Sequence, residues 1–509
     1  MNQIGFNNFR KFQYFPNLDL SPITIFVGEN NAGKSTVVKA ILSILDFLGT
    51  EIEGDDDLLG LRFFFNKSFF THVGTFQRAL NNSAKEGLIT LAASNGLYRI
   101  QIEMEGDKDD EQSISAQISE IVLTILPFNI DLDFKFKSGQ DRLIATFHST
   151  PSEYYKEMSA PYDTPTMREN YHKASVKYFK EMAKDIEMEM PISNGSLARG
   201  RIIEVLLDHF YSKVEATVKS MNNRAIDLFS NTLIINGLSK EAEDFLRSKR
   251  TLLSQRYFVE LAKNDVARRA SFGGFEYIYA HAVTQTVIYS AKDINDYFVR
   301  TIHDFANQRI EKETEVDKFI VRWMKIFRIG IDYEVSSFGG EAHIVKIKNS
   351  DDRIVNLADK GMGSIQLMIL LFRLASMMAN AGIQSPGQRR GDYTIIVEEP
   401  EQNLHPMLQS KLADFFYSLN KDYGFRFIIE THSEYLIRKS QVLVGEAHKT
   451  VDNYDNPFKV YYFPSDGEPY DLPYSKSGRF EEQFGTGFFD EASKWNREIL
   501  RNENSRQDR

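Results

Sequence analysis

Apolar positions along the chain recur at two spacings, one typical of strands and one typical of helices. Residues 23–27 are mostly apolar and are followed by Gly28, and residues 35–48 then carry apolar side chains three or four positions apart. This order predicts a strand, a glycine loop and a helix. Between about residues 88 and 150 every second position tends to be apolar, as in Tyr98–Met104, and this alternation predicts an antiparallel sheet.

The middle and the C-terminal part of the chain have different patterns. From about residue 151 to 330 the strand signals fade, and long helical patterns such as Ile202–Met221 and Lys240–Lys263 predict a helical insertion. Strand patterns return after it, together with a strongly apolar helix at Ser364–Met378. The strands expected there are residues 331–335, 343–348, 393–397 and 425–429. Apolar strands flanked by helices predict an α/β fold with helices on both faces of a sheet.

Composition narrows the class of protein and the chemistry open to it. The 509 residues are 42% hydrophobic and 26% charged, as in folded globular proteins with more than one domain. The formal net charge of −10 argues against a surface that coats nucleic acid everywhere. The chain has no cysteine, which excludes disulfides, thiol nucleophiles and Cys-ligated metals. Any metal chemistry must therefore use oxygen or histidine ligands.

The sequence also bears on the compartment. Residues 1–15 are polar and aromatic and contain no apolar core of a secretory signal. The most apolar stretch, Ile365–Ala379, is interrupted by Arg373 and is too short to span a bilayer. We therefore expect a cytoplasmic protein that does not contact a membrane.

The segment Gly28–Ser35 matches the phosphate-binding pattern G-x-x-x-x-G-K-[ST] and stands between a predicted strand and a predicted helix. Backbone N–H groups of such a loop surround the β-phosphate, and the helix N-terminus adds partial positive charge. Lys34 is expected to reach the β- and γ-phosphate oxygens, and Ser35 to offer its hydroxyl to Mg²⁺. The expected nucleotide-binding residues of this segment are Gly28, Asn30, Asn31, Ala32, Gly33, Lys34, Ser35 and Thr36.

Two adjacent carboxylates follow the apolar strand 393–397. We expect Glu398 to make an outer-sphere contact with magnesium and Glu399 to activate the attacking water. His432 ends the strand pattern that begins at residue 425, where it is placed to hydrogen-bond the γ-phosphate and hold the water. The alternative for the carboxylates alone is a pair of surface glutamates.

A second anion-binding element is expected at the start of the apolar helix. Leu357–Gln366 contains two glycines and a serine, namely Gly361, Gly363 and Ser364. N–H groups at a helix N-terminus lack intrahelical acceptors and attract anions.

Five segments in this order resemble the motifs of the ABC-type ATPase superfamily, in the branch that contains SMC proteins, RecF and OLD-family ATPases. They correspond to the Walker A loop (Gly28–Ser35), the signature (Leu357–Gln366), Walker B (Ile395–Glu399), the D-loop (Asn403–Pro406) and the switch histidine (His432). The resemblance implies an ATPase that uses ATP and Mg²⁺ and holds ATP between two copies of the chain.

Two of these motifs, Walker B and the signature, depart from their usual form. A further motif, the Q-loop, is incomplete. Glu398 stands where most members have Asp, and the signature has the form found in OLD-like ATPases. The Q-loop glutamine has one candidate, Gln77, for which an ordinary surface position is the alternative.

The resemblance implies a two-lobed P-loop ATPase head with a helical insertion. We expect lobe I at residues 1–150, the insertion at 151–330, lobe II at 331–465 and a C-terminal tail at 466–509. The insertion carries a basic strip that is either a solvated helical face or a contact surface for DNA phosphates. Its residues are Arg247, Lys249, Arg250, Arg256, Lys263, Arg268 and Arg269.

The chain resembles stand-alone OLD-like ATPases, which lack the TOPRIM nuclease domain of OLD proteins. The segment after His432 is too short for such a domain, so we expect no nuclease centre. The resemblance implies an oligomeric, ATP-gated sensor or scaffold for a separate effector, a nuclease or toxin, in bacterial anti-phage defence. Two alternatives stay open: a RecF- or SMC-like ATPase of DNA repair or chromosome maintenance, and a scaffold that holds nucleotide with little turnover.

Overall fold

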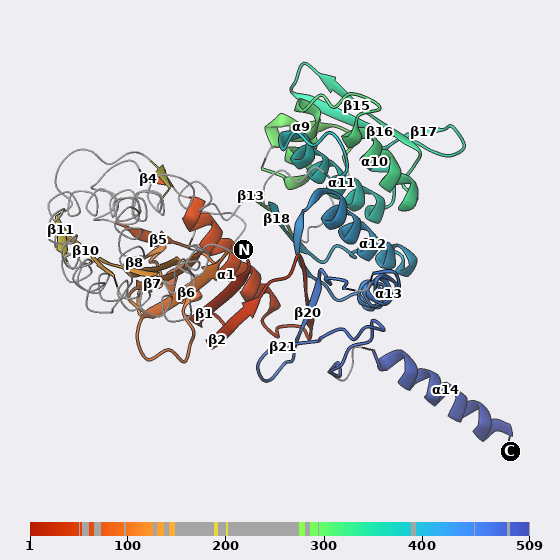
Figure 1. Cartoon of the computed structure of the whole chain (residues 1–509). Coiled ribbons are helices and arrows are strands. Elements are labelled where there is room, and N and C mark those ends of the chain that lie inside the picture. The colour runs from red at the N-terminus through yellow and green to blue at the C-terminus, as the bar shows by residue number, and fades with distance from the viewer. Residues whose placement is uncertain are drawn as a thin grey trace, which may run out of the picture. The chain divides into compact units, whose positions relative to one another are not determined.

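The computed structural model is described for fifteen segments of the chain. They are residues 1–49, 51–52, 61–65, 73–95, 98–125, 130–136, 142–147, 188–191, 200–201, 274–279, 286–293, 295–387, 393–451, 453–485 and 489–507. The chain divides into two compact units (Figure 1). The first comprises Met1–Asp19 and Thr36–Phe272, and the second comprises Leu20–Ser35 and Gly273–Arg509.

The first unit is built on an antiparallel sheet with the strand order β11-β10-β9-β8-β7-β6-β1-β2, in which β5 also pairs with β8. Its strands are β1 (Gln3–Phe9), β2 (Phe12–Asp19), β5 (Arg62–Phe64), β6 (Leu88–Ser94), β7 (Tyr98–Glu105), β8 (Ser115–Ile125), β9 (Ile130–Phe136), β10 (Arg142–Phe147) and β11 (Met188–Pro191). A separate short pair joins β4 (Glu51–Ile52) to β12 (Gly200–Arg201). Alternating apolar positions in β6 and β7 are buried, which confirms the expected antiparallel sheet.

Among the described residues, the first unit contains the helices α1 and α3. α1 (Lys34–Gly49) begins with Lys34 and Ser35 in the second unit and continues from Thr36 in the first. α3 (Phe76–Ala79) is a single turn, and Thr75 caps it by accepting a hydrogen bond from the backbone of Arg78.

The second unit is built on a sheet with the order β13-β18-β19-β3-β20-β21. Its strands are β3 (Ile23–Gly28), β13 (Gly274–Ile278), β18 (Tyr393–Glu398), β19 (Arg426–Glu430), β20 (Phe458–Phe463) and β21 (Tyr470–Asp471). All neighbours pair in parallel except β20 and β21. β3, β18 and β19 are almost entirely buried, as the short apolar runs of parallel strands require.

Helices and a small sheet complete the second unit. The helices are α9 (Tyr297–Asn307), α10 (Glu315–Ile326), α11 (Met362–Asn380), α12 (Pro406–Tyr423), α13 (Glu434–Thr450) and α14 (Glu491–Gln507), with short 3-10 turns η2 (Ala291–Asp293) and η3 (Leu357–Asp359). The small sheet contains β14 (Tyr289–Ser290), β15 (Asp332–Phe338), β16 (Ala342–Lys348) and β17 (Ile354–Asn356). One apolar core joins side chains of β3, β18 and β19 to those of α9 to α13.

Local sequence explains where these helices begin and end. Asp296, Thr314 and Ser433 precede α9, α10 and α13, and each side chain accepts a hydrogen bond from a backbone N–H of the first turn. α12 begins with Pro406 at its first position and ends at Gly424, which has a φ of 78°. Side-chain caps and a C-terminal glycine therefore set these ends.

In the described part of the chain, one helix is long and apolar enough by composition to cross a membrane. It is α11, and 61% of its most apolar window is buried inside the protein. Its side chains from Ile365 to Met378 pack into the core of the second unit, where it contacts α9 and α10. α11 is packed as a core helix of the second unit.

The division of the chain differs from the expected boundaries. Residues 274–330 were expected in a helical insertion, but β13, α9 and α10 lie in the second unit, and β13 pairs with β18. The strand β3, expected with residues 1–150, also lies in the second unit, because its partners are β19 and β20. Pairing between strands so distant in sequence leaves no local signal. The helical patterns at Ile202–Met221 and Lys240–Lys263 lie outside the described residues.

Candidate functional site

The C-terminal ends of β3, β18 and β19 place the predicted motifs at one edge of the sheet. Glu398 at the end of β18 pairs with Glu430 at the end of β19, and Glu430 in turn pairs with Phe26 of β3. Parallel strands all carry their carboxyl ends to the same edge, which is where α/β proteins bind ligands. The glycine loop after β3, the carboxylates after β18 and His432 after β19 therefore converge within the second unit.

The glycine loop has a backbone that other residues adopt with difficulty. Gly28 has a φ of 145°, and a Cβ there would lie 2.1 Å from the carbonyl oxygen of Phe463 in β20. The next N–H, that of Glu29, donates to the same carbonyl at 3.1 Å. Asn31 and Gly33 also have positive φ, 58° and 107°. The loop turns tightly against β20 because a glycine occupies position 28.

Lys34 points back into this loop. Its side chain is 3% exposed, and its Nζ donates to the carbonyl oxygens of Gly28 at 3.1 Å and Glu29 at 2.8 Å. Asn30 and Asn31 are exposed, whereas Ala32 and Gly33 are buried. The ammonium group of Lys34 is therefore held against the loop backbone, at the position where the sequence predicts a phosphate contact.

Ser35 hydrogen-bonds a carboxylate that the sequence analysis did not assign. Its Oγ donates to Glu430 Oε1 at 2.9 Å. Burial raises the pKa of Glu430 to about 7; the charge of Glu398 adds to this shift, whereas the Ser35 hydrogen bond and Lys34 oppose it. The available signal was position alone: Glu430 is a charged residue in the apolar strand that leads to His432.

The two expected Walker B carboxylates have different surroundings. Glu398 hydrogen-bonds the side chain of Tyr277. Burial raises the pKa of Tyr277 well above its ordinary value, and the charge and hydrogen bond of Glu398 raise it further. Glu399 has a φ of 44°, and its N–H donates to the carbonyl of Glu430 at 2.7 Å. Gln402 Nε2 donates to the Glu399 carboxylate. Glu399 is thus a non-glycine residue with positive φ directly after a strand, a conformation found in tight turns and at functional sites.

His432 is held through its backbone. Its N–H donates to Glu401 Oε1 at 2.6 Å, and burial raises the pKa of this Glu401 carboxyl. Burial lowers the pKa of His432, and the positive charge of Lys34 lowers it further, while Glu399 opposes the shift. The imidazole is therefore neutral at neutral pH, with one nitrogen to donate and one to accept a hydrogen bond.

The expected signature residues start α11. Gly361 is its exposed N-cap, and a Cβ on Gly361 would meet no atom within 4 Å. Gly363 is closely packed: a Cβ there would lie 2.5 Å from the carbonyl oxygen of Asn403, a residue with a φ of 58°. Ser364 donates its N–H to the carbonyl of Gly361 at 2.8 Å. The helix start thus contacts the expected D-loop, and His405 Nδ1 of that loop accepts from the N–H of Met407 to cap α12.

The oxygen donors at this edge suit a divalent cation that keeps most of its shell for phosphate and water. Ser35 offers a hydroxyl, and Glu398 and Glu430 offer carboxylates nearby. Within the described segments, no three His, Asp or Glu side chains are grouped so as to hold a metal alone. Magnesium commonly binds through one or two protein oxygens together with substrate phosphates, so these residues fit it.

The remaining expected residues are placed as follows. Thr36 is buried and follows Ser35 in the first turn of α1, and half-buried Gln77 lies in α3 of the first unit. The basic strip Arg247–Arg269 lies outside the described residues. The roles assigned to all site residues stay predictions.

A protein-family model described as an AAA ATPase domain matches residues 1–437. Among solved structures, the SMC head domain of Pyrococcus furiosus with an extended coiled coil, bound to the C-terminal domain of ScpA, is 11% identical with a TM-score of 0.32, covering 98% of this chain and 99% of that one. An SMC head bound to the C-winged helix domain of ScpA is 10% identical with a TM-score of 0.34, covering 92% and 97%. The SMC head domain of Thermotoga maritima is 10% identical with a TM-score of 0.32, covering 93% and 98%.

No curated protein matches the sequence. The family match covers most of the chain, including the glycine loop, both carboxylates and His432. It confirms the expected α/β P-loop ATPase fold, and the chain belongs to the AAA ATPase domain family.

Proposed function

We propose that this ATPase domain binds Mg·ATP at the Gly28–Ser35 loop and hydrolyses it with Glu399 as the general base. The observation that carries the proposal is the convergence of Lys34, Glu399 and His432 at the C-terminal edge of one parallel sheet. Lys34 and Glu399 are both close enough to His432 to shift its pKa in opposite directions. Positive charge at the phosphates, a base and a group that orients the attacking water are what in-line transfer of a phosphoryl group to water uses.

Each residue has a definite task in this reaction. Lys34 neutralises β- and γ-phosphate oxygens, and Ser35 offers its hydroxyl to Mg²⁺, which supplies charge neutralisation when it is bound. Glu399 accepts the proton of the attacking water, because its carboxylate is half-buried and tied by Gln402. Neutral His432 donates a hydrogen bond toward the γ-phosphate and holds the water in line.

The start of α11 supports an ATP sandwich between two copies of the chain. Gly361 and Met362 are exposed, and the first N–H groups of a helix have no intrahelical acceptor. Such a surface is suited to bind the γ-phosphate of a nucleotide held by another copy. Binding of ATP would then drive dimerisation, and hydrolysis would release the partner.

Three variants test these assignments together. Lys34→Ala is expected to lose ATP binding. Glu399→Gln is expected to bind ATP without turnover and to accumulate as a dimer or larger oligomer, measured by light scattering with and without ATP. Glu341→Gln is the matched control, since Glu341 is an exposed residue of the turn between β15 and β16. Unchanged turnover in Glu399→Gln would contradict the role of Glu399, and an ATP-bound monomer would contradict the sandwich.

The proposed cellular role rests on the resemblance to stand-alone OLD-like ATPases: an ATP-gated sensor or scaffold that controls a separate effector in anti-phage defence. The test is an affinity purification of Glu399→Gln from its native host, followed by mass spectrometry. A stoichiometric second protein with nuclease or toxin chemistry supports the role. Recovery of the chain alone with chromosomal DNA favours a repair or chromosome-maintenance ATPase instead, and absence of turnover in the wild type favours a nucleotide-holding scaffold.

A further inference from the structure

The strongest unassigned feature of the second unit is the carboxylate of Glu430 beneath the glycine loop. Glu430 is 6% exposed, although it ends a strand at the edge where the site residues gather. Its Oε1 accepts the Ser35 hydroxyl at 2.9 Å, while its Oε2 is buried and has no hydrogen-bond partner within the described segments. Burying a carboxylate with one oxygen unsatisfied is costly, so this arrangement needs a reason.

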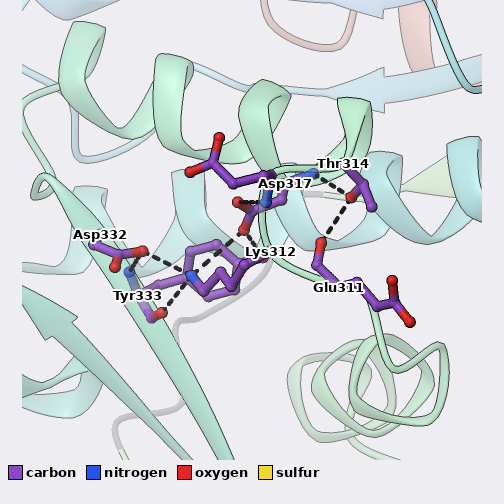
Figure 2. A network of polar contacts seen from close by, with 7 residues as sticks. Glu311, Lys312, Thr314, Asp317, Asp332 and Tyr333 are labelled. Atoms are coloured by element: carbon purple, nitrogen blue, oxygen red, sulfur yellow. Dashed lines mark hydrogen bonds and ion pairs between the residues drawn. The ribbon is translucent and has the colours of Figure 1, made fainter.

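A carboxylate with a purely structural task in the same unit is satisfied differently. Asp317 at the start of α10 is also buried, and both of its oxygens are engaged (Figure 2). Oδ1 accepts from the Tyr333 hydroxyl at 3.1 Å, and Oδ2 accepts from the N–H of Glu313 at 3.0 Å. Lys312 adds an ion pair at 3.4 Å. Glu430 lacks such a complete set, which indicates a task other than holding the fold.

The hydrogen bond with Ser35 has a direct consequence for a cation. A serine hydroxyl has one proton to donate and two lone pairs to offer. Because the proton is directed to Glu430, the lone pairs of Ser35 Oγ are left for a ligand on the exposed side of the loop. A residue that hydrogen-bonds a metal ligand orients that ligand and raises its basicity.

We propose that Glu430 is a positioning residue for the divalent cation of the nucleotide site, acting through the Ser35 hydroxyl. The inference rests on the proposed binding of Mg·nucleotide at the Gly28–Ser35 loop. In this proposal, Glu430 determines how strongly nucleotide binding depends on the cation. Lys34 and the loop backbone bind the phosphates themselves.

The experiment measures binding of a fluorescent ADP analogue to the full chain by titration, first in EDTA and then across a range of Mg²⁺ concentrations. Glu430→Gln keeps the shape of the side chain and removes its charge. In this variant, the Mg²⁺ concentration that gives half of the maximal enhancement of analogue binding is expected to rise by about 10- to 100-fold. This is the usual effect of losing a residue that orients a metal ligand. Affinity for the analogue in EDTA is expected to stay within about twofold of wild type, because the phosphate contacts are intact.

A double-mutant cycle separates this role from general damage. In a Ser35→Ala background, Glu430→Gln is expected to cause little further change in Mg²⁺ dependence, since Glu430 acts through Ser35. Asp317→Asn is the control for a buried carboxylate elsewhere in the same unit and is expected to leave the Mg²⁺ dependence unchanged. If Glu430→Gln fails to fold, Glu430→Asp keeps the charge at a shorter reach and is expected to give an intermediate shift.

Three results would overturn the inference: an unchanged Mg²⁺ midpoint in folded Glu430→Gln, an equal loss of affinity in EDTA, or effects of Ser35→Ala and Glu430→Gln that simply add. These outcomes differ from failure of the proposed function. In that case the wild type itself would show no nucleotide binding, or binding that Mg²⁺ does not change.

Discussion

Ser35 and Glu430 are 395 positions apart in the chain, and the Ser35 hydroxyl donates a hydrogen bond of 2.9 Å to the Glu430 carboxylate. The pair joins the first turn of α1 to the last residue of β19. It exists because β3 and β19 pair in parallel, with Ile25 opposite Ile429. The pairing of β3 with β19 thus places the phosphate loop next to a buried carboxyl group.

Gly28 is predicted to be intolerant of any side chain. Gly28→Ala would place a Cβ 2.1 Å from the Phe463 carbonyl oxygen at a φ of 145°, so the loop or β20 must shift. We expect a loss of a few kcal/mol in the free energy of unfolding of the second unit, measured by chemical denaturation, as for strained backbone positions. The control in the same unit is Gly361→Ala, where a Cβ meets nothing within 4 Å. Equal stability of the two variants would contradict the packing argument.

Substitutions at Gly363 and Gly361 are predicted to have different effects: the first on packing, the second on assembly of two copies. Gly363→Ala would bring a Cβ to 2.5 Å from the Asn403 carbonyl and is expected to lower stability, whereas Gly361→Ala has open space and is not. A bulky Gly361→Phe at the exposed N-cap is therefore expected to keep the fold and block the sandwich. Combined with Glu399→Gln, it should abolish the ATP-dependent dimer seen by light scattering. Persistence of that dimer would exclude Gly361 from the interface.

The second unit is predicted to lose stability in mild acid through His343. Burial lowers the pKa of this histidine from 6.5, and the nearby His303 ring, 3.0 Å away, lowers it further. The unfolded chain therefore takes up a proton as pH falls below about 6.5 while the folded one does not, so stability falls toward lower pH with a slope of at most about 1.4 kcal/mol per pH unit. His343→Gln should flatten that slope in denaturation curves between pH 7 and pH 5. A slope identical to wild type would assign the acid sensitivity to other groups.

Asp317 is predicted to stabilise the start of α10. Asp317→Ala would leave the buried Tyr333 hydroxyl and the Glu313 N–H without their acceptor (Figure 2). The Tyr333 hydroxyl is buried, and an unsatisfied buried donor costs about 1–3 kcal/mol, so thermal unfolding is expected at a clearly lower temperature. Asp332→Ala is the comparison, because its ion pair with Lys312 is half exposed and contributes little. A larger loss from Asp332→Ala would reverse the assignment.

Elements with a strong local period were predictable. The structure confirms the strands expected at 23–27, 393–397 and 425–429 and the helices expected at 35–48 and 364–378 to within a few residues. β13 was missed, because the alternation of Phe275, Glu276 and Tyr277 after Gly273-Gly274 is too short to stand out beside the long helical patterns that precede it. β20 was also missed, although Phe458–Phe463 is an apolar and aromatic run between Asn456-Pro457 and Pro464, a local pattern that predicts a strand. It supplies the carbonyl that Gly28 approaches.

The sequence by itself determined the phosphate loop, the adjacent carboxylates and the histidine, because each motif is a short run whose chemistry follows from residue type and spacing. Tertiary structure alone decided that β3 pairs with β19 and β20 and that Glu430 lies under Ser35. The physical reason is that register between parallel strands is set by packing across hundreds of residues. The contact between Ser35 and the buried carboxyl group of Glu430 is therefore visible only when the sheet is assembled.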